Sequence, residues 1–193
     1  MRGLKETQSF PFRLLTFLLG AFFFLCTSVF AAETHDAVLL RVSDGDTVWV
    51  LIEGRKVKVR LLGIDTPEKY PGKKLSREAA HCGVSEGYMK NLGQMATHHA
   101  KRLLHRGDKI KLVVYGRGYY GRVLGIIYLP DGTCYNEKMV ADGFACVYKY
   151  HGRKSKELPW REWIKLNYLL HEAKKHRRGL WSVDYKVMNC LCK

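Results

Sequence analysis

Apolar and polar residues alternate most clearly between residues 37 and 64, where Val, Leu and Ile dominate and "KVKVRLLGI" carries the alternation. An Asp-Gly pair and a further Gly interrupt this stretch, and these residue types favour turns. The pattern predicts three consecutive strands, joined by short turns, over about 37–42, 47–52 and 56–64. The segments "DKIKLVVY" and "RVLGIIYL" predict two more strands later in the chain.

Helical spacing follows in three segments. "LGQMATHHAKRLL" places four residues on one side of a helix: Leu92, Ala96, His99 and Leu103. "NEKMVADGF" predicts a short helix that ends at Gly143.

The last predicted helix begins near Pro159 and ends at Gly179. Its residues at positions i, i+3, i+7 and i+10 form an apolar stripe, which we expect to be buried: Trp163, Leu166, Leu170 and Ala173.

Residues 68–90 are polar and contain Gly, Pro, Lys and Ser, so a long loop is predicted, with a short helix around Ser76–Ala80. Five strands and about three helices predict an α+β fold that is mainly β, with a five-stranded barrel packed against the helices. An OB-fold is the natural candidate, since that architecture commonly presents a face to nucleic acid. Other five-stranded α+β folds fit the periodicity equally well.

The first thirty residues have a different pattern. Arg2, Lys5 and Arg13 precede the apolar run "LLTFLLGAFFFLC", and small residues follow it. This order is typical of a signal peptide, here residues 1–31, with cleavage after Ala31. The alternative is an uncleaved membrane anchor, because the run from 14 to 32 is just long enough to span a bilayer. Either interpretation predicts an exported domain.

The charge remains strongly positive after the leader. The chain has 33 Lys and Arg against 18 Asp and Glu, and the leader holds three of the former and only Glu6 of the latter, which leaves +13. A surplus of this size indicates a polyanionic partner or an anionic membrane surface.

Five cysteines follow the leader, namely Cys82, Cys134, Cys146, Cys190 and Cys192. An odd number in an exported protein leaves at least one thiol unpaired or paired between chains. The terminal "CLC" fits a disulfide or a spare thiol better than zinc, because a lone C-x-C with no adjacent His is a weak metal motif.

Acidic residues cluster where the predicted strands end. Asp46 opens the second strand and Asp65 closes the third, in "RLLGIDTPE". Two carboxylates with a main-chain carbonyl form a hard-oxygen site suited to Ca²⁺. Glu68 could orient or deprotonate a water beside such a metal. Taken alone, Asp-Gly and Asp-Thr-Pro are ordinary turn sequences.

Arginines complete this set. Arg60 precedes the acidic motif and Arg122 stands in "YYGRV". Guanidinium groups hold phosphate oxygens and stabilise the charge that develops during phosphoryl transfer. A lone strand arginine is more often a surface charge or an ion-pair partner.

The ordered set of "SDGDT", "RLLGIDTPE" and "YGR", together with "NEKMVADGFA" and "AKKHRRGLWS", resembles the staphylococcal nuclease family. The resemblance runs from about Ala37 to Ser182. It implies an OB-fold barrel with helices, and Ca²⁺-dependent cleavage of DNA and RNA that leaves 3′-phosphate ends.

Site residues carry over by motif. The resemblance implies that the side chains of Asp46 and Asp65 and the carbonyl of Thr66 bind Ca²⁺. Arg60 and Arg122 would bind and polarise the phosphate.

The same motifs imply further roles. Glu68 would be the general base, and Asp44 and Thr47 would support the metal ligands. Tyr120 and Tyr148 match tyrosines on the substrate side.

The chain also departs from the family pattern. Gly118 and Tyr119 stand where an acidic and then a basic residue are frequent, and Cys146 replaces the first tyrosine of a Tyr-Val-Tyr run. The segment from Lys69 to Asn91 is longer than in compact members, at the place of a mobile loop near the active site.

We therefore expect residues 35–183 to form a monomeric nuclease domain, followed by a C-terminal tail over 184–193. The protein is expected to be secreted or periplasmic, or anchored through 14–32 with the domain outside the cytoplasm. Two alternatives stay open: a non-catalytic nucleic-acid-binding barrel, and a basic membrane-surface protein. Neither alternative explains the acidic cluster, because carboxylates repel phosphate groups unless a metal lies between them.

Overall fold

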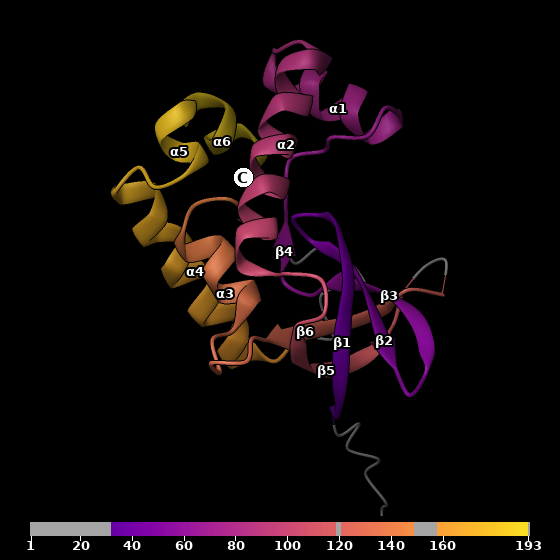
Figure 1. The fold of residues 1–193 in the computed structure, drawn as a ribbon. Helices are drawn as coiled ribbons and strands as arrows, with labels where there is room; N and C mark the ends of the chain where they lie inside the picture. The colour runs from indigo at the N-terminus through magenta and orange to yellow at the C-terminus, as the bar shows by residue number, and fades with distance from the viewer. Residues whose placement is uncertain (1–31, 119–120, 149–157, 193) are drawn as a thin grey trace, which may run out of the picture. The chain divides into compact units, whose positions relative to one another are not determined.

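A computed structural model describes residues 32–118, 121–148 and 158–192. Its strands, shown as arrows in Figure 1, are β1 (Glu33–Asp44), β2 (Thr47–Ile52), β3 (Arg55–Leu61), β4 (Ile64–Asp65), β5 (Lys109–Arg117), β6 (Val123–Tyr128) and β7 (Cys146–Val147). Its helices are α1 (Lys73–Cys82), α2 (Glu86–Leu103), α3 (Tyr135–Ala141), α4 (Trp160–Lys175), α5 (Leu180–Val183) and α6 (Tyr185–Leu191).

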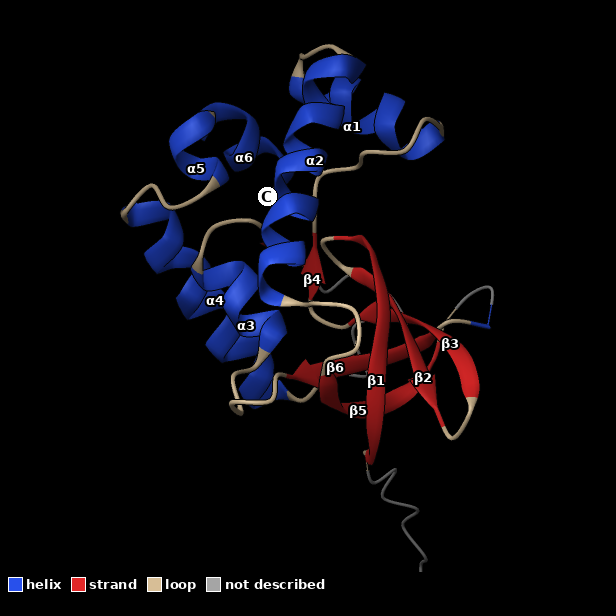
Figure 2. Cartoon of the chain, in the orientation of Figure 1, coloured by secondary structure: helices blue, strands red, loops and turns tan. Residues whose placement is uncertain are grey.

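Five strands close into a barrel in the order β1-β2-β3-β6-β5. All neighbours are antiparallel except β3 and β6, which run parallel. The described helices gather on one side of this barrel, so the β2–β3 hairpin projects away from them (Figure 2). The predicted five-stranded barrel and the α+β class are confirmed.

The barrel interior follows from the alternation in the sequence. Val48, Val50, Val59 and Leu61 each expose 1% or less of their surface. Their neighbours along the same strands point outward, as the period of two requires. The expected third strand is divided, because the chain turns at Gly63 (φ 76°) between β3 and β4.

The short helix predicted around Ser76–Ala80 is present but longer, and the prediction of a loop over the rest of 68–90 is wrong where α1 and the start of α2 lie. Residues 73–82 form helix α1, in which Leu75 and Ala79 are buried at i and i+4. Helix α2 begins at Glu86, capped by the Ser85 side chain, rather than near residue 92. Lys and Ser at the exposed positions of α1 hide its apolar spacing in the sequence.

Helix α4 begins after Pro159 as expected, and Leu166 and Ala173 of the predicted stripe are buried. The helix ends at Lys175, four residues before the predicted Gly179. Gly179 instead allows the turn into α5 at a φ of 52°.

A second apolar core joins the helices, and two disulfides lie beside it. Leu92 of α2, Trp181 of α5 and Met188 of α6 are buried in this core. Cys82 bonds to Cys190 and Cys146 bonds to Cys192.

Residues 185–191, expected to belong to a tail, form helix α6. Its Cys190 is bonded to the end of α1, and Cys192, which follows the helix, is bonded to β7. Cys134 is buried as a free thiol.

Within the described part of the chain, the helices are all too short or too polar to cross a bilayer. The expected signal peptide or anchor over 1–31 lies outside the described residues.

Candidate active site

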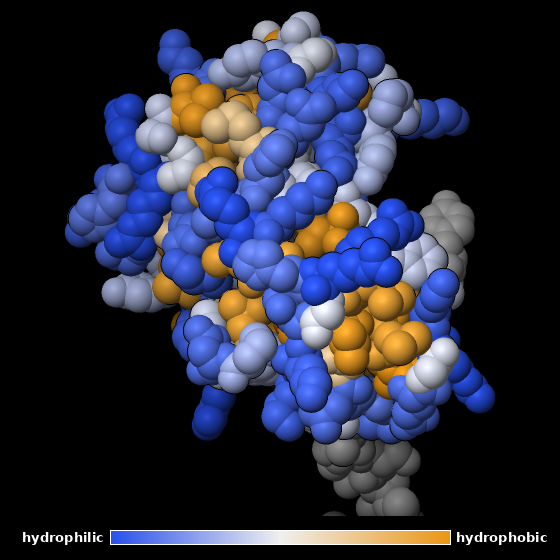
Figure 3. All heavy atoms as spheres, in the orientation of Figure 1, coloured by the Kyte–Doolittle hydropathy of each residue, from blue (hydrophilic) through white to orange (hydrophobic). Residues whose placement is uncertain are grey.

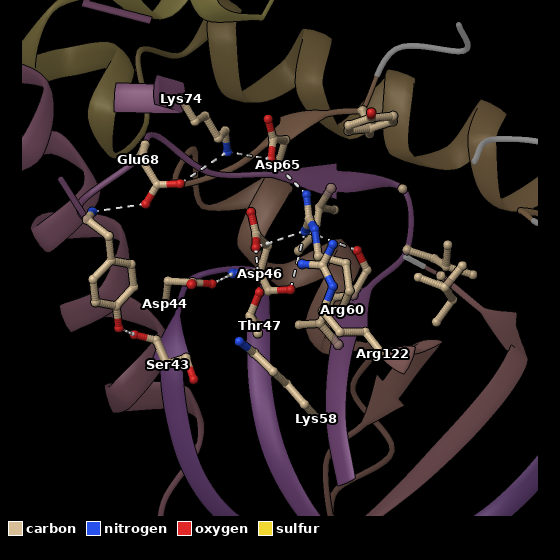
Figure 4. Close-up of a pocket in the computed structure, with 18 of the residues that line it drawn as sticks. Ser43, Asp44, Asp46, Thr47, Lys58, Arg60, Asp65, Glu68, Lys74 and Arg122 are labelled. Atoms are coloured by element: carbon tan, nitrogen blue, oxygen red, sulfur yellow. Dashed lines mark hydrogen bonds and ion pairs between the residues drawn. The ribbon is translucent and has the colours of Figure 1, made fainter. Parts of the chain in front are cut away.

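The acidic and basic residues singled out in the sequence meet in one pocket of about 550 Å³. The β1–β2 turn, the end of β3, strand β4 and helix α1 surround it, as Figure 4 shows. Asp46, Arg60, Asp65, Glu68 and Arg122 all line it.

Asp46 is held by the segment that carries Asp65. Its Oδ2 accepts hydrogen bonds from the backbone N–H (2.9 Å) and the hydroxyl (3.1 Å) of Thr66, and Thr47 donates to its Oδ1 at 3.0 Å. A Cβ on Gly45 would lie 2.6 Å from the Thr66 methyl group, so the turn can approach Thr66 this closely only with Gly at that position.

Arg60 bridges the two carboxylates. Its Nη1 lies 2.9 Å from Asp46 Oδ1 and its Nη2 lies 2.7 Å from Asp65 Oδ1. The side chain is 16% exposed, so these ion pairs are only partly screened by water. The fork of the guanidinium therefore fixes the spacing of Asp46 and Asp65.

Lys74 of α1 adds a second cation on the other side of Asp65. Its Nζ lies 3.1 Å from Asp65 Oδ1, 3.4 Å from Glu78 Oε1 and 3.8 Å from Glu68 Oε2. Burial lowers the pKa of Lys74, but the charges of Asp65, Asp46 and Glu78 outweigh burial and the pKa is raised. The lysine is therefore charged and neutralises the acidic cluster.

The aspartates of the β1–β2 turn differ in pKa. Burial alone would raise the pKa of Asp46, but Arg60, Lys74 and the Thr66 N–H outweigh it and hold the pKa below the usual range. Burial and then the charge of Asp46 raise the pKa of Asp44 to about 7. Asp44 Oδ1 accepts the backbone N–H of Asp46 at 3.2 Å, so it supports the turn.

Glu68 is oriented by the backbone. Its Oε1 accepts from the N–H groups of Lys69 (2.9 Å) and Tyr70 (3.0 Å), while Oε2 faces Lys74. Gly93 of α2 lies against this segment, and a Cβ there would be 2.6 Å from the Pro67 carbonyl oxygen. The close approach of α2 therefore supports the position of Glu68.

Two of the remaining predicted residues reach the same pocket. Arg122 points into it beside Arg60 (Figure 4), and Tyr148, just after β7, also lines it. The backbone N–H of Tyr148 donates to the Gly63 carbonyl at 2.8 Å, which holds this segment against the β3–β4 turn. Tyr119 and Tyr120 lie outside the described residues.

The chemistry of the donor atoms fits Ca²⁺, because Asp46, Asp65 and Thr66 offer only oxygen. No cluster of three or more His, Cys, Asp or Glu side chains within the described ranges is arranged as a ready metal site. The cations of Arg60 and Lys74 instead lie against the carboxylates. An incoming metal would therefore compete with both side chains for Asp65.

The sequence analysis missed several pocket residues, among them Lys74, Glu78 and Tyr70. Lys74 and Glu78 come from α1, of which only about residues 76–80 were predicted to be helical. The i, i+4 spacing of this charged pair, next to the equally spaced Leu75 and Ala79, was the available signal. Tyr70 closes one edge by donating its hydroxyl to the Ser43 carbonyl at 2.9 Å.

Comparison with known proteins gives consistent matches. Residues 58–183, more than half of the chain, match the family model described as staphylococcal nuclease homologue. An uncharacterized endonuclease of Escherichia coli is 32% identical over 154 residues, which cover 80% of this chain and 81% of that protein. A micrococcal nuclease of Shigella flexneri is 30% identical over 166 residues, covering 82% and 80%.

Proposed function

Because this chain belongs to the staphylococcal nuclease homologue family, we propose that it is an exported Ca²⁺-dependent endonuclease that cleaves DNA and RNA and leaves 3′-phosphate ends. The family and the relatives support nuclease activity. The observation that carries the proposal is the convergence of Asp46, Asp65, Glu68, Arg60 and Arg122 in one pocket.

The proposed reaction adds water across one phosphodiester bond. Glu68 takes a proton from the attacking water, whose oxygen forms a bond to phosphorus. The bond between phosphorus and the 5′ oxygen breaks, and that oxygen gains a proton from solvent. The products are a 3′-phosphate and a 5′-hydroxyl.

Charge stabilisation is assigned to the two arginines. Negative charge on the phosphoryl oxygens grows toward the transition state, and guanidinium donors fixed in a pocket stabilise it. Arg60 forms ion pairs with Asp46 and Asp65 in the described structure. When a phosphate binds, Arg60 therefore gives up part of these ion pairs to contact the phosphate oxygens.

Asp46, Asp65 and the Thr66 carbonyl are the residues proposed to hold Ca²⁺. The ion, when bound, would neutralise charge on the phosphate as a Lewis acid. The irregular oxygen set favours Ca²⁺ over Mg²⁺, because Mg²⁺ demands nearly ideal octahedral geometry.

Two features support export to an oxidising compartment. The amino-terminal order of basic, apolar and small residues is typical of a signal peptide. Disulfides such as Cys82–Cys190 and Cys146–Cys192 are typical of proteins outside the reducing cytosol. We place the mature domain in the periplasm or outside the cell, or tethered to a membrane through 14–32.

The test is cleavage of labelled single- and double-stranded DNA and of RNA by the chain from Ala32 onward, with disulfides formed. We expect hydrolysis in Ca²⁺, little in Mg²⁺ and none in chelator. Fragments should become polymerase-extendable only after phosphatase treatment, which identifies 3′-phosphate. Binding without cleavage in any of these metals would instead support a non-catalytic barrel.

A further inference from the structure

A row of three side chains crosses the outer face of the barrel next to the active site. Trp49 of β2 pairs in register with Arg41 of β1 on one side and Lys58 of β3 on the other. The Arg41 guanidinium carbon lies 5.3 Å and the Lys58 Nζ 5.9 Å from the centre of the indole ring. A partly exposed aromatic ring is thus flanked by two exposed cations.

This row connects two hollows. Arg41, Trp49 and Lys58 all line the active-site pocket, and Arg41 and Trp49 also line a second groove of about 940 Å³. The groove lies between β1, β2, the start of β3, the last turn of α2 and the residues that follow α2. The active site and the groove are therefore adjacent and share the side chains of Arg41 and Trp49.

The groove has an apolar floor and a basic rim. Leu40 and Val42 lie partly exposed in it, and Figure 3 shows apolar side chains over β1 and β2 bordered by hydrophilic ones. Lys56, Lys101 and Arg106 line it together with Arg41.

Among the described residues that line the groove, Asp and Glu are absent. The active-site pocket differs in this respect, because it mixes carboxylates with cations. The groove is therefore suited to an anion without an intervening metal.

Basic residues of β3 form a row that starts at Arg60, an arginine proposed to bind the reacting phosphate. Arg60, Lys58 and Lys56 alternate along β3, and Lys58 and Lys56 are both exposed. Alternate residues of a strand are about 6.7 Å apart, so this row is about 13 Å long. A strand of nucleic acid whose phosphate lies at Arg60 can therefore follow the row toward the groove.

We propose that this groove binds the single-stranded nucleic acid on one side of the cleaved bond, with a base stacked on Trp49 and phosphates held by the basic rim. The inference rests on the proposed nuclease function, and it adds a binding site outside the pocket that carries the chemistry. Aromatic rings bind bases of any sequence by stacking, and basic side chains follow the backbone. Unpaired bases expose the faces that stack on an indole ring, whereas a duplex hides them. A base that stacks on Trp49 replaces Arg41 or Lys58 over the ring, and the displaced cation is then available to a phosphate.

The experiment measures binding separately from cleavage. Fluorescence anisotropy in chelator gives the affinity of the disulfide-bonded chain from Ala32 onward for labelled oligonucleotides of 2 to 12 nucleotides. We expect affinity to rise with length and to level off at about 4 to 8 nucleotides. Trp49→Ala should weaken binding of the longer strands about tenfold, while Trp49→Phe should retain most of it.

The rim is tested by salt dependence. Each phosphate contact to a single strand contributes about 0.7 to the slope of log affinity against log salt. Lys101→Gln and Arg106→Gln should each reduce the slope by about that amount. Lys90→Gln is the matched control, because Lys90 is an exposed lysine of the same helix as Lys101 and lies in neither hollow.

The outcomes separate the two proposals. The rim variants Lys101→Gln and Arg106→Gln lie outside the active-site pocket, and they support the groove if they weaken binding of long strands but cleave a dinucleotide in Ca²⁺ at the wild-type rate. The groove proposal would be overturned if Trp49→Ala and the rim variants kept the wild-type affinity and the wild-type salt dependence. It would also be overturned if these variants lost equal affinity for duplex and single-stranded DNA. A wild-type protein that binds single strands through the groove without cleaving them would overturn only the nuclease proposal.

Discussion

Glu68 and Arg122 line the same pocket but perform different tasks in the proposed reaction. Glu68→Gln keeps an oxygen for the N–H groups of Lys69 and Tyr70 but cannot take a proton. We expect turnover to fall about 10²–10⁴-fold. Arg122→Ala should cost about 10²–10³-fold, since it removes a donor to the transition state.

Binding provides the control for this prediction. Most affinity for nucleic acid should come from the many exposed cations, so either single substitution should change it little. Single-turnover cleavage and a titration at matched salt, with thermal melts to check folding, make the comparison. Cleavage at the wild-type rate by both variants would show that these residues do not carry the chemistry.

Lys74 supplies a positive charge where a metal would add another. Its Nζ is 3.1 Å from Asp65 Oδ1, and charges this close interact strongly in a partly buried site. Lys74→Met should therefore tighten Ca²⁺ binding by about tenfold or more, and should lower the melting temperature in chelator, where Asp65 loses a partner.

The neighbouring Lys73 is the matched control, since it is exposed and does not line the pocket. Lys73→Met should leave both quantities near their wild-type values. Calorimetric titration with Ca²⁺ measures the affinity. Equal affinities in the two variants would mean that Lys74 does not compete with the metal.

At the scale of elements, the Cys146–Cys192 bond attaches α6 to strand β7. In the β4–β7 pair, Cys146 is the register partner of Asp65. Cys146→Ser with Cys192→Ser should lower the free energy of unfolding by about 2–4 kcal/mol. Denaturant titration measures this change.

The Cys82–Cys190 bond is the comparison for that variant. It attaches α6 to the end of α1 rather than to the strand beside Asp65. Its removal should destabilise the fold by a similar amount. We expect Ca²⁺ affinity to weaken more when the Cys146 bond is lost, and the reverse order would exclude a role for β7 in positioning Asp65.

Asp142 joins α2 to the end of α3. It lies 2.8 Å from His99 Nε2 and 2.7 Å from Lys138 Nζ. Burial raises its pKa, but His99 and Lys138 outweigh burial and the pKa is lowered. The unfolded chain therefore binds a proton at Asp142 more tightly than the folded protein does. The contribution of Asp142 to the free energy of unfolding is complete above the unfolded pKa of about 3.9, and it is lost as the pH falls through the lower folded pKa.

The matching variant is Asp142→Asn. It should lower the free energy of unfolding near neutral pH by about 1–2 kcal/mol and should flatten the fall in stability below about pH 4. Urea titrations across this pH range measure both effects. If the stability of the variant falls as steeply below about pH 4 as that of the wild type, Asp142 does not contribute to the loss of stability in acid.

For the whole molecule, we predict that residues 1–31 act as a signal peptide and direct the proposed nuclease out of the cytoplasm. We expect the exported product to begin near Ala32, because small residues follow the apolar run. Amino-terminal sequencing of exported material tests this. Recovery of the chain in the membrane fraction with Met1 intact would favour the anchor instead.

Some features were determined by the sequence alone. Apolar residues at every second position predicted the barrel strands, because alternate side chains of a strand face the same core. The motifs around Asp46, Asp65 and Arg122 predicted a shared pocket, since their residues stand at the ends or starts of strands that the barrel brings together.

Other features depended on the tertiary structure. The polar surface of α1 hid the full length of its helix, which runs from Lys73 to Cys82 because Leu75 and Ala79 are buried in the second core. Cysteine pairing follows from the position of α6 between α1 and β7, and no spacing in the sequence encodes that position. Lys74 reaches Asp65, and Arg41 reaches Trp49, only after packing and strand register bring distant segments within interaction distance.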